Sequence, residues 1–285
     1  MKINAERLAS GLLSVVAFSA LASLLLIALF IFREGLPFML KIGLCDFLFS
    51  PVWNPAVGQF GIAAMIVASL GVTLGAMLIG VPLGIAGAIF MNEFLPVPVT
   101  RVIKPAIELL AGIPSVVFGF LGVMVLAPLI RAHLGGPGLS FLAAAVILGI
   151  MILPTIISIS TDALAAVPPA YREGALALGA TRWQSVYRVT IKAARSGILA
   201  SVILAMGRAL GETMAVIMVA GNTVKIPRAV TDPVRTLTAN IALEMSNATG
   251  MAREALFATG VVLFVVIMIL NGVALSVIKG RGDRR

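Results

Sequence analysis

Six long apolar segments constrain this chain more than any other feature of its sequence. Each is about as long as an α-helix must be to cross the hydrocarbon core of a bilayer, which takes roughly 20 residues. A chain in lipid must satisfy its backbone polar groups internally, so spans of this kind are helices. We therefore predict an all-α, polytopic membrane protein with six transmembrane helices. The predicted spans are 10–32, 61–91, 105–130, 141–161, 196–220 and 255–278.

Composition supports the membrane assignment. Hydrophobic residues make up 60% of the chain and charged residues 12%, about half the charged fraction of a soluble domain. The first span exceeds a signal-peptide core and lacks a small-residue cleavage site before Arg33, so we interpret it as an anchor. The single cysteine, Cys45, cannot form an internal disulfide, and we interpret it as a packing residue.

Basic residues predict the orientation of the spans. Thirteen lysines and arginines flank one side of the predicted spans and seven flank the other. By the positive-inside rule, both termini and the loop 162–195 lie in the cytoplasm. We expect an N-terminal anchor helix with an outer loop over 1–60, a main transmembrane region over 61–278 and a basic cytoplasmic tail over 279–285. The excess of basic residues on the predicted cytoplasmic side accounts for the net charge of +9. No nucleic-acid-binding motif is present.

A charged stretch, 171–192, stands between the fourth and fifth spans. A proline pair just before it suits a first helical turn. Gly179 can adopt the left-handed conformation that ends a helix. Thr181 followed by Gln184 forms a capping-box pattern, which predicts the start of a second helix. The residues alone leave lipid and a protein surface equally open as the partner of these two helices.

Two charged residues lie inside the fifth span. An arginine at the depth of Arg208 costs about 2.5–3.5 kcal/mol in a bilayer. Glu212 follows four residues later, which predicts an intrahelical ion pair. Two interpretations stay open. The pair either locks helices together, or it faces a water-accessible path where the guanidinium binds a tetrahedral oxyanion.

The third span contains a predicted site of bending and one acidic residue. The Gly-Ile-Pro-Ser stretch that ends in Pro114 and Ser115 predicts a kink. Either this kink is purely structural or it contacts the substrate. We expect Glu108, near the inner end of the span, to reach the membrane interface. In the outer connection, Asp232 before Pro233 predicts a helix start.

The charged stretch resembles the cytoplasmic EAA loop of ABC importer permeases, whose pattern is E-A-A-x3-G-x9-I-x-L-P. The match runs over 173–179 and continues with Val189 and Ile191. Gly174 replaces the first alanine of the pattern, and Lys192 stands where proline is usual. Three further stretches, GIPSVVFGF at 112–120, MILPTI at 151–156 and GRALGETMAV at 207–216, resemble phosphate-specific ABC importer permeases, the last one their C-type subunit.

The resemblance implies a type I ABC importer permease fold over 61–278, and a membrane permease subunit that carries inorganic phosphate. It also implies four kinds of partner besides lipid: a second homologous permease subunit, two cytoplasmic ATPase subunits and an extracytoplasmic phosphate-binding protein. The loop 162–195 would dock on the ATPase. The residues expected there are Tyr171, Arg172, Glu173, Gly174, Ala175 and Gly179. The residues expected on the substrate path are Pro114, Ser115, Arg208 and Glu212.

We do not expect this chain to be an enzyme. It lacks the G-x4-G-K-[ST] phosphate loop, so ATP and Mg²⁺ belong on a partner ATPase. The single histidine, His133, has no cluster of metal-ligand residues around it in sequence, and we expect neither a metal nor a cofactor on this chain. Two alternatives stay open: a permease for another oxyanion such as sulfate or molybdate, and an ion-coupled secondary transporter.

Overall fold

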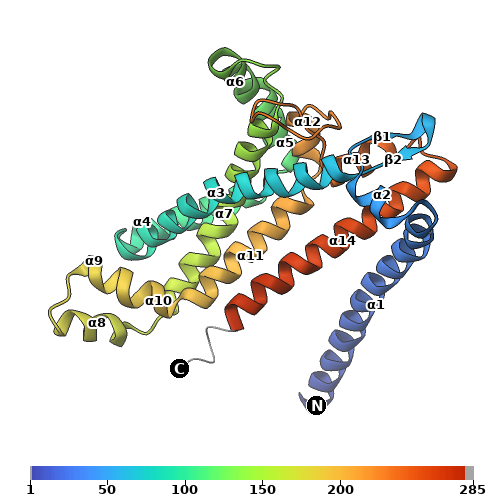
Figure 1. Ribbon diagram of the computed structural model, residues 1–285. Coiled ribbons are helices and arrows are strands. Elements are labelled where there is room, and N and C mark those ends of the chain that lie inside the picture. Colours follow the sequence, from blue (N-terminus) through green and yellow to red (C-terminus); the bar gives the residue numbers. More distant parts are fainter. Residues whose placement is uncertain (1, 280–285) are drawn as a thin grey trace.

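The computed structural model describes residues 2–279, most of which are in helices (Figure 1). The helices are α1 (Lys2–Ile42), α2 (Leu44–Phe49), α3 (Ala63–Glu93), α4 (Val97–Ala111), α5 (Ser115–Leu121), α6 (Ala127–Leu134), α7 (Phe141–Ala165), α8 (Pro169–Ala177), α9 (Arg182–Ser185), α10 (Ile191–Ala193), α11 (Arg195–Gly211), α12 (Met214–Val219), α13 (Leu237–Glu244) and α14 (Gly250–Lys279). Strands β1 (Trp53–Asn54) and β2 (Gln59–Phe60) form a small antiparallel hairpin. The predicted boundary at residue 60, between the anchor region and the main transmembrane region, stays a prediction. The predicted tail beyond Lys279 lies outside the described residues.

Five helices in the described range are long and apolar enough to cross a membrane. A further candidate is the pair Arg182–Ala193 and Arg195–Gly211, which is bent by 68°. With this pair counted as one span, the total is the six predicted from the sequence. The five are Ala9–Ile42, Ala63–Glu93, Ser115–Leu134, Phe141–Ala165 and Gly250–Val273.

Helices α3 and α7 form the centre of the molecule. Small residues let them approach closely: Gly84 of α3 lies against Ile156 of α7, and Gly80 lies against Ile152. Helix α11 packs along α7, whereas α1 packs on α14 at the other side of the molecule (Figure 1). An edge-to-face pair of Phe30 and Phe257, with ring centroids 5.5 Å apart, joins α1 to α14.

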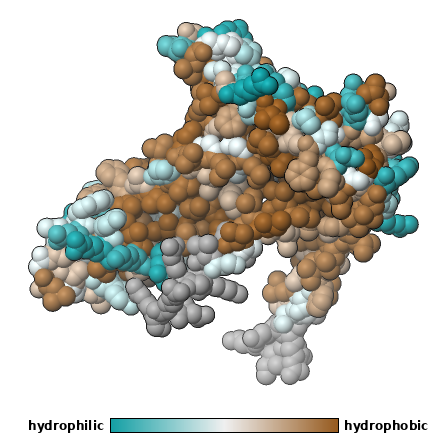
Figure 2. Space-filling view, in the orientation of Figure 1, coloured by the Kyte–Doolittle hydropathy of each residue, from teal (hydrophilic) through white to brown (hydrophobic). Residues whose placement is uncertain are grey.

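The surface divides into an apolar middle and two polar ends. Figure 2 shows a broad hydrophobic band over the long helices, with hydrophilic patches over the α8–α9 region at one end and over the opposite end of the molecule. Residues 9–26 of α1 are exposed throughout. An apolar band between polar ends is the surface that a bilayer covers.

The third predicted span is wrong in its bounds. Residues 97–111 form a separate helix, α4, none of whose residues is buried, and the apolar span begins only at Ser115. Pro114 adopts an extended conformation (φ −56°, ψ 137°) that breaks the chain between α4 and α5. The predicted kink is therefore present, but it separates two helices. Glu108 accordingly lies on α4, outside the span.

The fifth predicted span is also interrupted. Helix α11 ends at Gly211, and Glu212 is extended (φ −68°, ψ 132°) before α12 begins at Met214. The carbonyl of Glu212 accepts a hydrogen bond from the Thr238 hydroxyl of α13, at 2.9 Å. Its side chain accepts one from the backbone N–H of Ala215, at 3.1 Å. These two contacts satisfy the groups that the helix break exposes.

Two smaller expectations are also wrong. Helix α13 begins after Thr236, whose hydroxyl accepts the Ala239 N–H. Asp232 instead closes a turn, where the N–H groups of Arg228 and then Ala229 lower the pKa of its carboxyl. Cys45 is exposed on α2, so it is no packing residue.

Candidate functional site

The charged loop folds as two helices with a break, as predicted. Gly179 has a left-handed φ of +82° after the end of α8. The capping box is complete: Thr181 Oγ1 accepts the Gln184 N–H at 3.2 Å, and Gln184 Oε1 accepts the Thr181 N–H at 2.9 Å. The second helix then runs through a π-helical turn, Val186–Thr190, to Ala193.

Helix α8 presents an open face at one end of the molecule. None of its residues is buried, Tyr171 is 57% exposed, and Leu178 just beyond the helix is 91% exposed. Glu173 and Gly174 are exposed beside them. Large apolar side chains that project next to a carboxylate from a short helix suit a macromolecular contact. Four of the predicted coupling residues are therefore accessible, namely Tyr171, Glu173, Gly174 and Gly179, and Ala175 is half-buried.

Arg172 is the exception among the predicted coupling residues. Its guanidinium turns toward the body of the protein and forms an ion pair with Glu93, the last residue of α3. Arg182, at the start of α9, donates to the backbone carbonyl of Glu93 and lies over the ring of Phe94, 5.2 Å from its centroid. Sequence reasoning missed Glu93, because its partners are 79 and 89 residues away along the chain.

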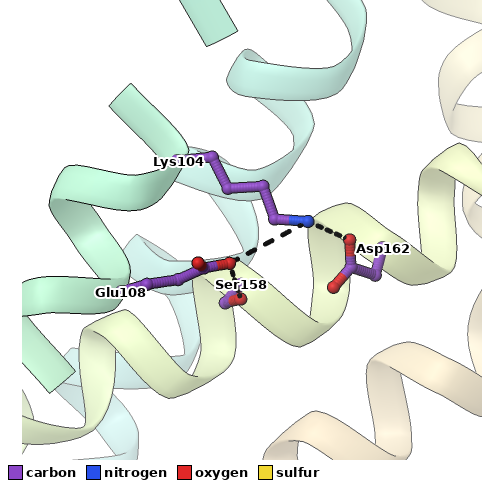
Figure 3. Close-up of polar contacts among 4 residues, drawn as sticks. All are labelled: Lys104, Glu108, Ser158 and Asp162. Atoms are coloured by element: carbon purple, nitrogen blue, oxygen red, sulfur yellow. Dashed lines mark hydrogen bonds and ion pairs between the residues drawn. The ribbon is translucent and has the colours of Figure 1, made fainter. Parts of the chain in front are cut away.

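A second polar cluster ties α4 to α7 (Figure 3). Lys104 forms an ion pair with Asp162 and approaches Glu108 at 4.0 Å. The Ser158 hydroxyl donates to Glu108 at 3.4 Å. Because the charged side chains are 32–59% exposed, each pair contributes only about 0–1 kcal/mol to stability. This cluster positions α4 and has no evident chemistry.

Arg208 of α11 lies where three segments meet. Its Nη1 donates to the Thr155 hydroxyl of α7, and its Nη2 donates to the Ala111 carbonyl at the end of α4, both at 3.3 Å. Over residues 2–279, no carboxylate forms an ion pair with it within 4.0 Å. The predicted pair with Glu212 is therefore wrong, because the helix ends between the two residues.

A cavity of about 680 Å³ opens beside this guanidinium. Thr155 and Asn271, from α7 and α14, add a hydroxyl and an amide to its wall. The remaining lining residues are Ala200, Ile203, Leu204 and Gly207. Sequence reasoning did not single out Thr155 or Asn271, since neither is charged and a lone threonine or asparagine in a helix has no local pattern that indicates a binding site.

The other three predicted path residues lie outside this cavity lining. Pro114 and Ser115 start α5, and Glu212 precedes α12. Ala111, which binds Arg208, is three residues before Pro114. Among the described residues, no group of three His, Cys, Asp or Glu side chains could hold a metal ion. The arrangement is a hydrogen-bonded guanidinium that has no anionic partner within residues 2–279 and lies beside a mostly apolar cavity that also carries a hydroxyl and an amide.

Residues 80–284 match the protein family described as the binding-protein-dependent transport system inner membrane component. This chain belongs to that family. With its five or six apolar helices, this family member is a multi-pass protein of the inner membrane. The relatives found are named as transport permeases rather than as enzymes.

Relatives of this permease cover most of its length. The probable ABC transporter permease protein YqgH of Bacillus subtilis is 44% identical over 253 residues, which are 86% of this chain and 82% of the relative. The phosphate transport system permease protein PstC of Mesorhizobium japonicum is 41% identical over 250 residues, 80% of this chain and 76% of the relative.

Solved structures confirm the predicted type I ABC importer permease fold. A chain of a bacterial ABC transporter that imports the acidic polysaccharide alginate superposes with a TM-score of 0.60 at 18% identity, covering 95% of this permease and 98% of that chain. A chain of the MetNI methionine ABC transporter gives 0.56 at 18% identity, covering 77% and 94%.

Proposed function

We propose that this chain is the membrane permease subunit of an ATP-driven importer that carries inorganic phosphate. The observation that supports it most directly is Arg208, a guanidinium within a membrane span that lies on a cavity wall without an ion-pair partner in the described part of the chain. A charge at such a depth costs about 2.5–3.5 kcal/mol. An anion in the cavity would offset that cost.

The chemistry around Arg208 suits an oxyanion. A guanidinium offers two parallel N–H groups that match two oxygens of a tetrahedral anion. The hydroxyl of Thr155 and the amide of Asn271 can each donate a further hydrogen bond from the same wall. Pro114 and Ser115 lie just past the Ala111 carbonyl that holds the arginine, so we keep them on the proposed path. The role of Glu212, which we place at the outer end of the proposed path, stays a prediction.

Phosphate is favoured over other oxyanions by the relatives. Several of those named as phosphate transport system permeases are 37–41% identical to this chain. Sulfate and molybdate have the same tetrahedral shape, so a permease for either is the alternative that a transport assay must separate.

We assign the exposed face of α8 to the coupling of transport with ATP hydrolysis. Tyr171, Glu173 and Leu178 would dock on a cytoplasmic ATPase, which binds ATP and Mg²⁺ in place of any cofactor on this chain. The complete importer would hold a second homologous permease, two ATPase subunits and an extracytoplasmic phosphate-binding protein. Both termini and the α8–α10 loop would face the cytoplasm, as the basic residues predict.

Arg208→Gln in the complete complex, reconstituted in lipid vesicles, tests the proposal. We expect phosphate uptake to fall about 10- to 100-fold, since a charge-assisted hydrogen bond is worth about 1.5–3 kcal/mol. ATP hydrolysis and assembly should persist. Arg131→Gln is the matched control, because that arginine lies in α6 and binds only the Pro137 carbonyl among the contacts found.

Three results would contradict the proposal. Unchanged uptake in Arg208→Gln would remove Arg208 from the path. Stronger competition by sulfate or molybdate than by unlabelled phosphate would show that the substrate is that anion and not phosphate. Uptake by vesicles that contain this chain without any ATPase would place it among ion-coupled transporters.

A further inference from the structure

Glu93 is the charged residue on which both helices of the α8–α10 loop converge. Only 3% of its surface is exposed, although it ends a helix at a polar end of the molecule. One carboxylate oxygen binds Arg172 of α8, and the other accepts the side-chain amide of Asn92 at 2.9 Å. Its backbone carbonyl accepts from Arg182 of α9.

The two arginines approach Glu93 from opposite sides of the break in the loop. Arg172 precedes Gly179, and Arg182 follows the capping box that starts at Thr181. A cation–π contact with Phe94 holds Arg182 over the end of α3 as well. The loop is thus joined to the end of α3 by one arginine on each side of its break, in addition to its covalent links to α7 and α11.

Helix α3 can carry a displacement from this point to the other end of the molecule. It is one helix from Ala63 to Glu93, with Pro82 inside it, and its 31 residues span roughly 46 Å at 1.5 Å per residue. Along that length its glycines lie directly against side chains of α7, so the two packed helices would move together. A movement of Glu93 along the helix axis would therefore reach the outer end of α3.

We propose that Glu93 is a positioning residue that transmits movement of the coupling loop into α3. The proposal rests on the proposed function, because it presumes that an ATPase moves the loop. In it, Arg172 links the loop to the membrane domain of this chain, while the exposed residues before and after it, Tyr171 and Glu173, contact the ATPase. Neighbouring residues of α8 would thus bind two different partners: Arg172 binds α3 of the same chain, and Tyr171 and Glu173 bind the ATPase.

The test measures phosphate transported per ATP hydrolysed in vesicles that contain the complete complex. Glu93→Gln keeps the size of the side chain and removes its charge. We expect this ratio to fall about tenfold, whereas assembly with the ATPase and ATP hydrolysis persist. Arg172→Gln should give the same loss. The double variant should lose no more than the worse single variant, because the two residues form one link.

Glu108→Gln is the matched control. It removes a carboxylate that also joins two helices, α4 and α7, but whose contacts within residues 2–279 are with Lys104 and Ser158 and not with the loop. Its transport ratio should equal that of the wild type. If Glu93→Gln does not assemble, Phe94→Leu removes the ring beneath Arg182 and leaves the ion pair in place. That variant should lower the ratio about two- to threefold.

The outcomes separate this proposal from the function on which it rests. Wild-type transport ratios in Glu93→Gln or in Phe94→Leu would overturn it. So would losses that multiply in the double variant. A loss of assembly and ATP hydrolysis in Phe94→Leu as well as in Glu93→Gln would also overturn it, because the contacts of Glu93 and Phe94 with the loop would then be structural only. A wild-type complex without ATP-driven phosphate uptake would instead refute the proposed function.

Discussion

At Gly84, α3 and α7 leave no space for a methyl group. A Cβ atom there would lie 2.7 Å from Cγ2 and 2.8 Å from Cβ of Ile156. Because the isoleucine contact is at its branch point, it cannot rotate away. We expect Gly84→Ala to destabilise the protein by about 1–3 kcal/mol, the usual cost of overpacking.

Thermal unfolding in detergent measures this effect. Gly11→Ala is the control, since no heavy atom lies within 4 Å of the position where its Cβ would be. Equal melting temperatures for the two variants would show that the central helices can separate without cost.

Single residues were predictable where one local anomaly marked them. Arg208 stood out because a charge inside an apolar segment is costly. Glu93 and Asn271 gave no such indication: the first lies between a span and a polar connection, and the second is uncharged. Their roles depend on contacts across the fold, such as the Arg172–Glu93 ion pair between residues 79 apart. No local pattern records such a contact.

The conformation of Gly179 determines how α8 ends. Its φ of +82° is left-handed, and no neighbouring atom would touch a side chain there. Gly179→Ala therefore introduces backbone strain alone, about 1–2 kcal/mol. We expect faster hydrogen exchange of the α8 amides in this variant. Gly174→Ala, at a helical position with equal space, should slow that exchange, because alanine favours helix by about 1 kcal/mol. Equal exchange in both variants would contradict this account.

Helices with local start and stop residues were predicted well, and breaks set by distant contacts were not. The capping box at Thr181 and the turn at Gly179 both form as expected. The break at Glu212 was missed, because the Thr238 hydroxyl that supports it lies 26 residues later. The second half of helix α4, residues 105–111, was included in the third predicted span, although Glu108 already argued against a lipid-crossing segment there.

At the scale of the whole molecule, the long helices connect two polar ends that differ in their charged residues. The loop of α8–α10 lies at one end, near the last residue of α3. The hairpin and α2 lie at the other end, near its first residues (Figure 1). In a bilayer these two ends must face opposite compartments, so one accessible residue at each end is enough to test the orientation.

Cys45 makes that test possible, because it is the chain's single cysteine and is exposed on α2. The basic residues predict that the α8 end faces the cytoplasm and therefore that Cys45 lies outside. In right-side-out membrane vesicles, a membrane-impermeant maleimide should label the wild type at once. The double variant Cys45→Ser with Leu178→Cys carries its thiol at a position that is 91% exposed in the loop, and it should react only after the vesicles are permeabilised. Cys45→Ser alone should never react. The reverse labelling pattern would show that the protein has the opposite orientation in the membrane, in which α8 could not contact a cytoplasmic ATPase.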